Sequence, residues 1–389
     1  MLDVMEQDRA FLAEKDARIF ELEARISALR AANKSAREQL NSYKYPVTTL
    51  PSKIVREVFL YMAPSYPYLL PLIARYSPLL LTQVCSQWRK IAHETPALWR
   101  AIDLTLSRKR QTSIDARLAT FLASSWLARS SSLPLSIRYD DRHADGVSLS
   151  LISTLVPHRC CFEYLMLYVS GAQLNTIAGP MPVLRELHLH LQGTEFDAVT
   201  FHSQDLPLLR ALRLESSSPL SITFPWSQLT SLELKRLHSH DYMSALKQTS
   251  QLVHLKLDVF APDTPLVETD IVLPYLESLV IENTIDTNRA LLGLLVTPGL
   301  VRLQLHEHSL QGYTELARIE SLAAFVVKSG CQLCELEITE SVEEISEEAL
   351  CEAFSSIPTV KIQLSPEYED EYYYEYAFDD GDSDCSWLE

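Results

Sequence analysis

The sequence predicts a mixed α/β protein, α+β overall, in which a helical N-terminal part precedes a repeat solenoid of parallel strands. Apolar residues recur at helical spacing up to about residue 99, and a leucine motif recurs from about residue 160. Glycine is scarce, with 9 in 389 residues, and the two that lie closest together are Gly293 and Gly299. This spacing excludes the glycine-rich loops that bind nucleotide phosphates.

The first segment, residues 1–44, has the pattern of a coiled-coil helix. Apolar side chains alternate in steps of three and four from Ile19 to Tyr43, which is the a/d spacing of a heptad repeat. Asn33 falls at an a position, where its amide can pair across a two-stranded interface. Residues 11–43 could therefore mediate self-association, and a lone solvated amphipathic helix is the alternative.

Residues 45–100 predict a compact set of amphipathic helices. Pro51 suits the first turn of a helix over residues 50–62, and Ser77 and Pro78 suit the start of a second helix that ends at Thr95. The apolar stripe of the first helix consists of Ile54, Val55, Val58, Phe59 and Met62. A proline-rich stretch separates the two helices, and a last short element begins at Ala97.

The unit L-x-x-L-x-L recurs eight times, with its central leucines spaced by 20 to 33 residues. Residues two apart lie on one face of a strand, and the rest of each unit must return to start the next parallel strand. Stacked units bury a continuous row of leucines that a single unit cannot bury. Residues 101–365 are therefore expected to form a curved parallel sheet.

Two parts of the chain resemble known families. The ordered motifs L-P-x-x-I-x-x-x-V-F, V-C-x-x-W-R and P-x-L-W, within residues 50–99, resemble the F-box. The repeats resemble leucine-rich repeats, and an F-box followed by such repeats is a known family arrangement. The F-box resemblance covers about an eighth of the chain.

This resemblance implies a substrate-recruiting subunit of a cullin–RING (SCF-type) ubiquitin ligase. In that family the three-helix F-box docks on a small adaptor subunit, and partner subunits carry out ubiquitin transfer, so the chain itself is not expected to be an enzyme. The residues that the resemblance assigns to the adaptor contact are Leu50, Pro51, Ile54, Val58, Phe59, Val84, Cys85 and Trp88. The alternative is a repeat scaffold whose F-box-like helices only cap the solenoid.

The sequence departs from the family pattern in three places. Lys53 stands at a commonly acidic position, and the stretch over residues 60–83 is longer than usual. Both departures bear on adaptor binding. The repeats also lack the asparagine or cysteine that usually follows the last leucine by three positions, which predicts irregular loops.

Residues that alternate with the repeat leucines should face the concave side of the sheet, where they could bind a protein substrate. The candidates are His188, Arg213, Glu233, Lys235, His254, Lys256, Arg302, Gln304 and His306. A solvated face that contacts nothing is the alternative.

Charge is distributed unevenly. Residues 1–334 hold equal numbers of acidic and basic residues, whereas residues 335–389 hold 18 acids and one base, Lys361. The absence of a basic patch argues against nucleic-acid binding. Residues 366–389 predict a disordered acidic tail, whose tyrosines could alternatively form a docking motif.

Neither a membrane partner nor metal chemistry is expected. No secretory signal and no run of 18 apolar residues is found, and seven irregularly spaced cysteines are typical of an intracellular protein, cytoplasmic or nuclear. Three His-x-His pairs lack a third ligand, and Cys331 and Cys334 form a single C-x-x-C. The sequence therefore predicts no metal, cofactor or catalytic residue.

Overall fold

The computed structural model describes residues 2–42, 49–72, 77–105, 116–140, 149–193, 198–216, 218, 222–259, 269–282, 291–310, 312, 314–340 and 345–364. The predicted acidic tail, residues 366–389, lies outside these ranges.

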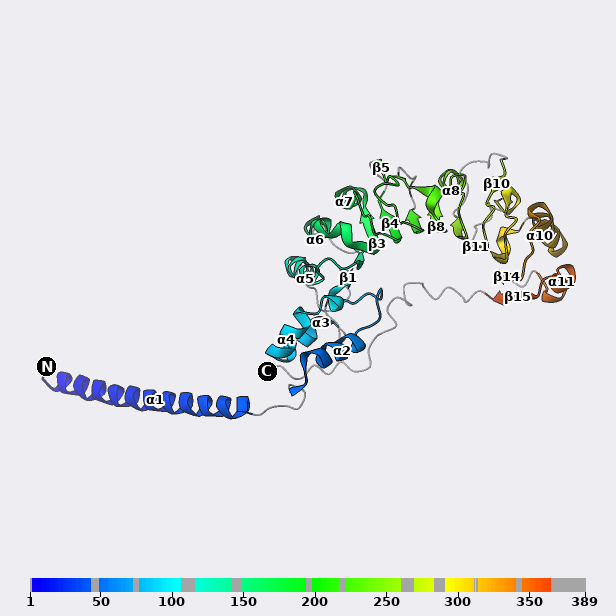
Figure 1. Cartoon of the computed structure of the whole chain (residues 1–389). Coiled ribbons are helices and arrows are strands. Elements are labelled where there is room, and N and C mark those ends of the chain that lie inside the picture. The colour runs from blue at the N-terminus through cyan, green and yellow to red at the C-terminus, as the bar shows by residue number, and fades with distance from the viewer. Residues whose placement is uncertain are drawn as a thin grey trace.

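The described chain is a mixed α/β structure built on an 11-stranded parallel sheet, which confirms the predicted class (Figure 1). The strands follow one another in chain order across the sheet, so each one pairs with the strands before and after it. They are β1 (Ala101–Thr105), β2 (Leu135–Asp140), β3 (Phe162–Ser170), β4 (Glu186–Gln192), β6 (Ala211–Ser216), β8 (Ser231–Leu237), β9 (His254–Val259), β11 (Ser278–Glu282), β13 (Arg302–His306), β14 (Glu335–Glu340) and β15 (Thr359–Leu364).

The repeat leucines stack in register along this sheet. Leu212 pairs with Leu187 on one side and with Leu232 on the other, and the row continues through Leu255 and Leu279. These side chains are almost fully buried, while the residues between them are half-buried or exposed. The period of two within each strand thus produces one continuous apolar layer.

The segments between strands lie on the outside of the arc that the sheet describes (Figure 1). They include α5 (Ala116–Arg129), α6 (Leu149–Leu155), α7 (Gly171–Ile177), α8 (Ser239–Leu246), α9 (Leu291–Leu294), α10 (Glu315–Ser329) and α11 (Glu347–Ala353). Two short paired sheets, β5 (Val199–Thr200) with β7 (Ile222–Thr223) and β10 (Ile271–Val272) with β12 (Leu295–Val296), take the place of helices elsewhere. The crossovers therefore differ in secondary structure from one strand pair to the next.

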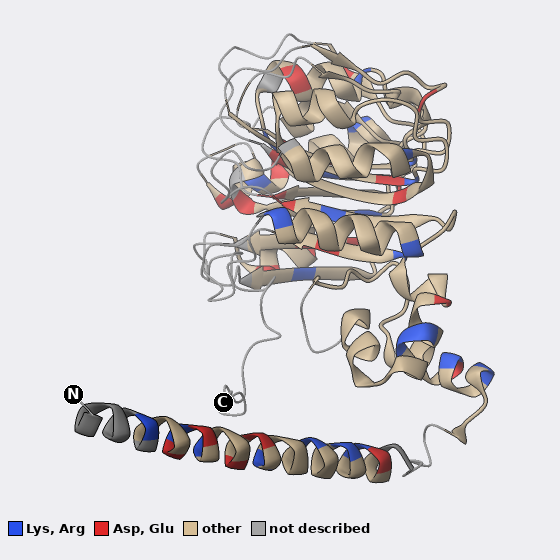
Figure 2. Cartoon of the chain, turned by 90° about the vertical axis from the view of Figure 1, so that its left-hand side faces the viewer, with Lys and Arg blue, Asp and Glu red and all other residues tan. Residues whose placement is uncertain are grey.

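The N-terminal part contains one long helix and a helical module, residues 49–99. The long helix, α1 (Leu2–Ser42), carries acidic and basic residues along its length (Figure 2). The module contains α2 (Ser52–Met62), α3 (Pro78–Val84), α4 (Ser86–His93) and the 3-10 helix η2 (Pro96–Trp99). The expectation of one continuous helix from Ser77 to Thr95 is wrong. Cys85 is extended (φ −157°, ψ 169°) and separates α3 from α4.

The module packs directly onto the first strands. Trp99 is fully buried, donates its indole N–H to the Ala92 carbonyl at 2.8 Å, and meets Trp126 of α5 edge-on at 5.1 Å between ring centroids. The segment after α2 runs along the edge strand, where Asp103 N donates to the Leu70 carbonyl at 2.8 Å. Module and sheet therefore share one hydrophobic core.

Candidate partner-binding surfaces

Helix α2 has two apolar faces. Val55 and Phe59 form the inner face and are buried in the module. Ile54, Val58 and Tyr61, spaced by four and three residues, form the outer face and are 48%, 42% and 92% exposed. A helix that stabilised only its own domain would carry polar residues on its outer side. The outer face is therefore an apolar surface that the described chain leaves uncovered.

Other apolar side chains of the module are also exposed. Leu50 precedes α2, Met62 ends it, and Leu80 and Val84 lie four residues apart on α3. Val84 is 60% exposed, so this residue, which the resemblance assigns to the adaptor contact, lies at the surface. Exposed aliphatic groups gathered on a small module are typical of protein-binding surfaces.

Phe59 does not contribute to this surface, contrary to its assignment as an adaptor contact. Its ring is fully buried and meets Trp88 of α4 edge-on, with 5.0 Å between the ring centroids. Trp88 and Cys85 are half-buried, and the Cys85 thiol accepts the N–H of Trp88 at 3.4 Å. The contact between Phe59 and Trp88 thus holds α2 against α4 on the buried side of both helices. Pro51 is exposed at the start of α2.

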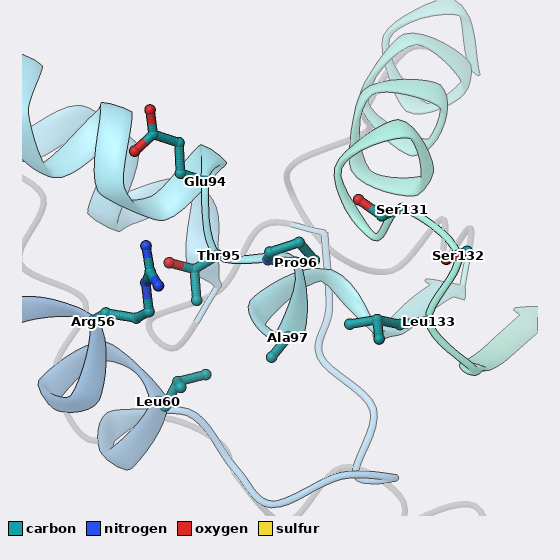
Figure 3. A pocket seen from close by; sticks show the side chains of 9 residues that line it. All are labelled: Arg56, Leu60, Glu94, Thr95, Pro96, Ala97, Ser131, Ser132 and Leu133. Atoms are coloured by element: carbon teal, nitrogen blue, oxygen red, sulfur yellow. The ribbon is translucent and has the colours of Figure 1, made fainter. Parts of the chain in front are cut away.

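A pocket of about 300 Å³ marks the junction between the module and the sheet (Figure 3). Arg56 and Leu60 line it from α2, Pro96 from η2, and Leu133 from the turn before β2. At about 3.6 residues per turn, Arg56 and Leu60 point away from the helix axis on a different side of α2 from Ile54 and Val58. The pocket is therefore separate from the outer face of α2.

The second candidate surface is the concave face, formed by the residues that alternate with the repeat leucines. Its centre is an ion-pair network around Glu233, whose carboxylate lies 3.6 Å from Lys235 Nζ, 3.7 Å from Arg213 Nε and 3.9 Å from Lys256 Nζ. Lys256 Nζ also lies 2.6 Å from Glu282. The network thus brings together four of the sequence-predicted residues from the neighbouring strands β6, β8 and β9.

Lys235 is the exception among these residues. It is only 6% exposed, it lies at a β-bulge in β8, and its amine lies 3.6 Å from the Glu233 carboxylate and interacts electrostatically with Glu215 and Asp258. Its assignment as a substrate contact is corrected to a buried structural cation. His254 and Arg302 are exposed, and His188, Gln304 and His306 are half-buried.

Acidic side chains on the concave face have shifted pKa values. A hydrogen bond with His188, 2.7 Å away, lowers the pKa of Glu186. Burial raises the pKa of Glu215, but His190 at 3.1 Å and the nearby cations outweigh burial, so the net shift is downward. Burial raises the pKa of Asp258. The surroundings of Glu186 on β4 and Glu215 on β6 therefore favour the ionised carboxylate, whereas those of Asp258 disfavour it.

Sequence reasoning missed the aromatic end of the concave face. Tyr66 of the module meets Tyr164 of β3 edge-on at 5.8 Å between centroids, and the Arg100 guanidinium lies 3.8 Å from the Tyr66 ring centroid. Tyr168 lies 5.1 Å from His190 between centroids. Tyr164 and Tyr168 alternate with Leu165 and Leu167 in the sequence of β3, and this alternation was the available signal.

The other candidate chemistry gives no site within the described ranges. No group of three His, Cys, Asp or Glu side chains there could hold a metal ion. Cys331 is buried, which raises the pKa of its thiol, whereas Cys334 is exposed. Among the helices described, none has the length and apolar content needed to cross a membrane.

Comparison with known proteins adds no family: no protein-family model matches the chain, and no curated protein matches it.

Proposed function

We propose that this chain is the substrate-recruiting subunit of a cullin–RING ubiquitin ligase. The helical module acts as an F-box and binds the small adaptor subunit, while the sheet acts as a leucine-rich-repeat domain whose concave face binds a target protein. The chain contributes proximity, raising the effective concentration of target near the transferase subunits, and performs no chemistry itself.

The observation that carries this proposal is the second apolar face of α2. Val55 and Phe59 on the inner face are buried within the module. Ile54, Val58 and Tyr61 on the outer face remain exposed. An exposed helical row of apolar side chains is suited to docking against a groove or helix of another protein. Ile54 and Val58 coincide with F-box motif positions that the sequence resemblance assigns to the adaptor, and Tyr61 extends the same row.

The concave face supports the target-binding half of the proposal. Rigid strands hold its side chains in fixed positions, and the face combines both signs of charge with aromatic rings at one end. His254 and Arg302 are its exposed predicted contacts, and both lie at one level of the sheet because each pairs with Ser278. A target that carries both acidic and apolar groups fits such a face.

Co-purification with the adaptor tests the proposal. The full chain carrying Ile54→Asp and Val58→Asp is expected to lose adaptor binding by at least about 100-fold, because two charges would be buried in the contact. Leu118→Asp with Phe121→Asp on α5 is the matched control, since it places the same charges on another exposed apolar helix surface.

The control variant should recover as much adaptor as the unsubstituted chain, and both variants should keep its circular dichroism spectrum. Failure of the unsubstituted chain to bind the adaptor, or full recovery with the Ile54/Val58 variant, would overturn the proposal. Phe59→Asp is unsuitable for this purpose, because it introduces a charge into the module's core.

The alternative function is a scaffold in which the module caps the end of the repeats. The contact between Trp99 and Trp126, and the pairing of Leu70 with Asp103 at the sheet edge, favour a capping role. These contacts use the inner side of the module and the segment after α2. Capping alone gives no reason for the apolar outer face of α2.

A further inference from the structure

Helix α1 carries an apolar seam that the described chain leaves exposed. Its large a and d side chains are between 43% and 68% exposed: Ile19, Leu22, Ile26, Leu29 and Leu40. All described side chains from Phe11 to Leu40 are exposed, so no part of the described chain covers any side of the helix. A long helix with a bare heptad seam is typical of one strand of a coiled coil.

We propose that α1 forms a parallel, in-register, two-stranded coiled coil with a second copy of this chain. The occupant is a second copy because the seam is complementary to itself. Each a residue faces the same a residue of the partner, and each d residue faces the same d residue, when the helices are parallel and in register. This inference does not depend on the proposed ligase function.

Asn33 decides the orientation. In the parallel arrangement it faces the partner's Asn33, and the two amides can hydrogen-bond to each other within the seam. In the antiparallel arrangement with the best charge matching, Asn33 faces the partner's Leu22, which offers no hydrogen bond. An unsatisfied buried amide weakens association by roughly tenfold or more, and that arrangement buries two of them.

The charged flanks of the seam are a smaller influence. In the parallel coil Arg18 lies near the partner's Glu23 and attracts it, whereas Arg25 lies near the partner's Arg30 and repels it. The antiparallel coil would replace these contacts with attractive pairs only. An exposed ion pair changes an equilibrium by about twofold, so the gain does not compensate for two unpaired amides.

The buried area is sufficient for a specific but moderate association. Each chain contributes five large seam residues, and about half of each side chain is exposed. Burying these exposed halves on both chains removes about 300–600 Å² of apolar surface from water in total. The aliphatic stems of the flanking side chains, such as Arg18 and Arg25, add to this area. The total approaches the lower limit of about 1,000 Å² for a specific interface, so dimerisation should depend on concentration in the micromolar range.

The orientation has a consequence for assembly. Six residues, 43–48, separate α1 from the described start of the module, and a chain of that length spans at most about 20 Å. A parallel coil therefore places both modules at the same end, with their first residues within about 50 Å of each other. Two concave faces held in one dimer would favour targets that carry two copies of the recognised segment, a consequence that rests on the proposed target binding.

Light scattering on the full chain tests the dimer. Over a series from about 1 to 100 μM, the mass should rise from monomer to dimer, and Leu22→Asp with Leu29→Asp should hold it at monomer. Ala24→Asp with Ala31→Asp, at the outer f positions of the same turns, is the matched control and should still dimerise. A monomeric unsubstituted chain throughout the series, or a control variant as monomeric as the seam variant, would overturn the proposal.

A single cysteine tests the orientation. In the parallel coil Leu40→Cys places two thiols opposite each other at an a position, within reach of a disulfide, so oxidation should crosslink the dimer. In the antiparallel coil the same thiols lie about 37 Å apart. Ala31→Cys and the unsubstituted chain, with its own seven cysteines, are the controls. Dimers without additional crosslinking in the Leu40→Cys variant would refute the parallel arrangement.

Discussion

The two faces of α2 should respond oppositely to truncation. Phe59→Ala removes a fully buried ring that contacts Trp88, whereas Val58→Ala removes two methyl groups from a side chain that is 42% exposed. The two residues are neighbours in the same helix, so helix propensity and position are closely matched. A difference between the variants therefore measures packing.

The structure sets the size of this difference. A buried Phe→Ala substitution costs about 3–5 kcal/mol, of which the edge-on contact with the Trp88 ring contributes about 0.5–1.5 kcal/mol. The Val58 methyl groups are partly hydrated already, so their removal costs about 1 kcal/mol at most. The expected separation is at least about 2 kcal/mol.

Hydrogen exchange in peptides from the module measures the local free energy of opening. Phe59→Ala should accelerate exchange in α4 by more than about 100-fold, whereas Val58→Ala should change it by less than about tenfold. Equal effects of the two variants would show that the outer face is packed and not exposed. Unchanged exchange in Phe59→Ala would show that the ring does not support the module.

The remaining predictions concern the concave side. Tyr66→Phe removes the hydroxyl that donates to Glu163 Oε2 at 2.9 Å and should lower the free energy of unfolding by about 1–2 kcal/mol in urea denaturation. Glu215→Gln should lower the thermal midpoint at pH 7, because the fold favours its charged form. Asp258→Asn should leave the midpoint unchanged or raise it, because burial disfavours that charge. The depressed pKa values of Glu186 and Glu215 stabilise the fold fully above their ordinary value of 4.5. This contribution should be lost as pH falls through the folded-state pKa values, and the double Gln variant should lose less stability over the same range. A steeper acid loss in that variant, or a lower midpoint for Asp258→Asn than for Glu215→Gln, would contradict the assignment.

The repeat region was predictable because the sequence of each repeat strand shows which of its two faces is buried. Leucine at every second position fixes which side is buried, and the steady spacing between motif copies fixes the chain order. The strands β1 and β2 lacked this signal. Their buried rows contain Ile102, Ile137 and Tyr139 in place of leucine triplets, so the sheet begins two strands earlier than the motif does.

The helical module was less predictable, because apolar residues on several sides of a helix do not reveal which side is inside. Ile54 and Val58 are as hydrophobic as Val55 and Phe59, and only the position of α4 determines which pair is buried. The break at Cys85 was invisible for a related reason. One extended residue between two short helices leaves the helical spacing of apolar residues almost unchanged.

The long segment between α2 and α3 allows capping and partner binding to coexist. Its residues contact the first three strands. The Leu70 carbonyl accepts from Asp103 N of β1, the Pro67 carbonyl accepts from the Ser136 hydroxyl of β2 at 2.9 Å, and Tyr66 donates to Glu163 of β3. This backbone covers β1, so the edge does not need α2 as its cover. The segment between α2 and α3 thus covers the start of the sheet, which leaves the outer face of α2 exposed.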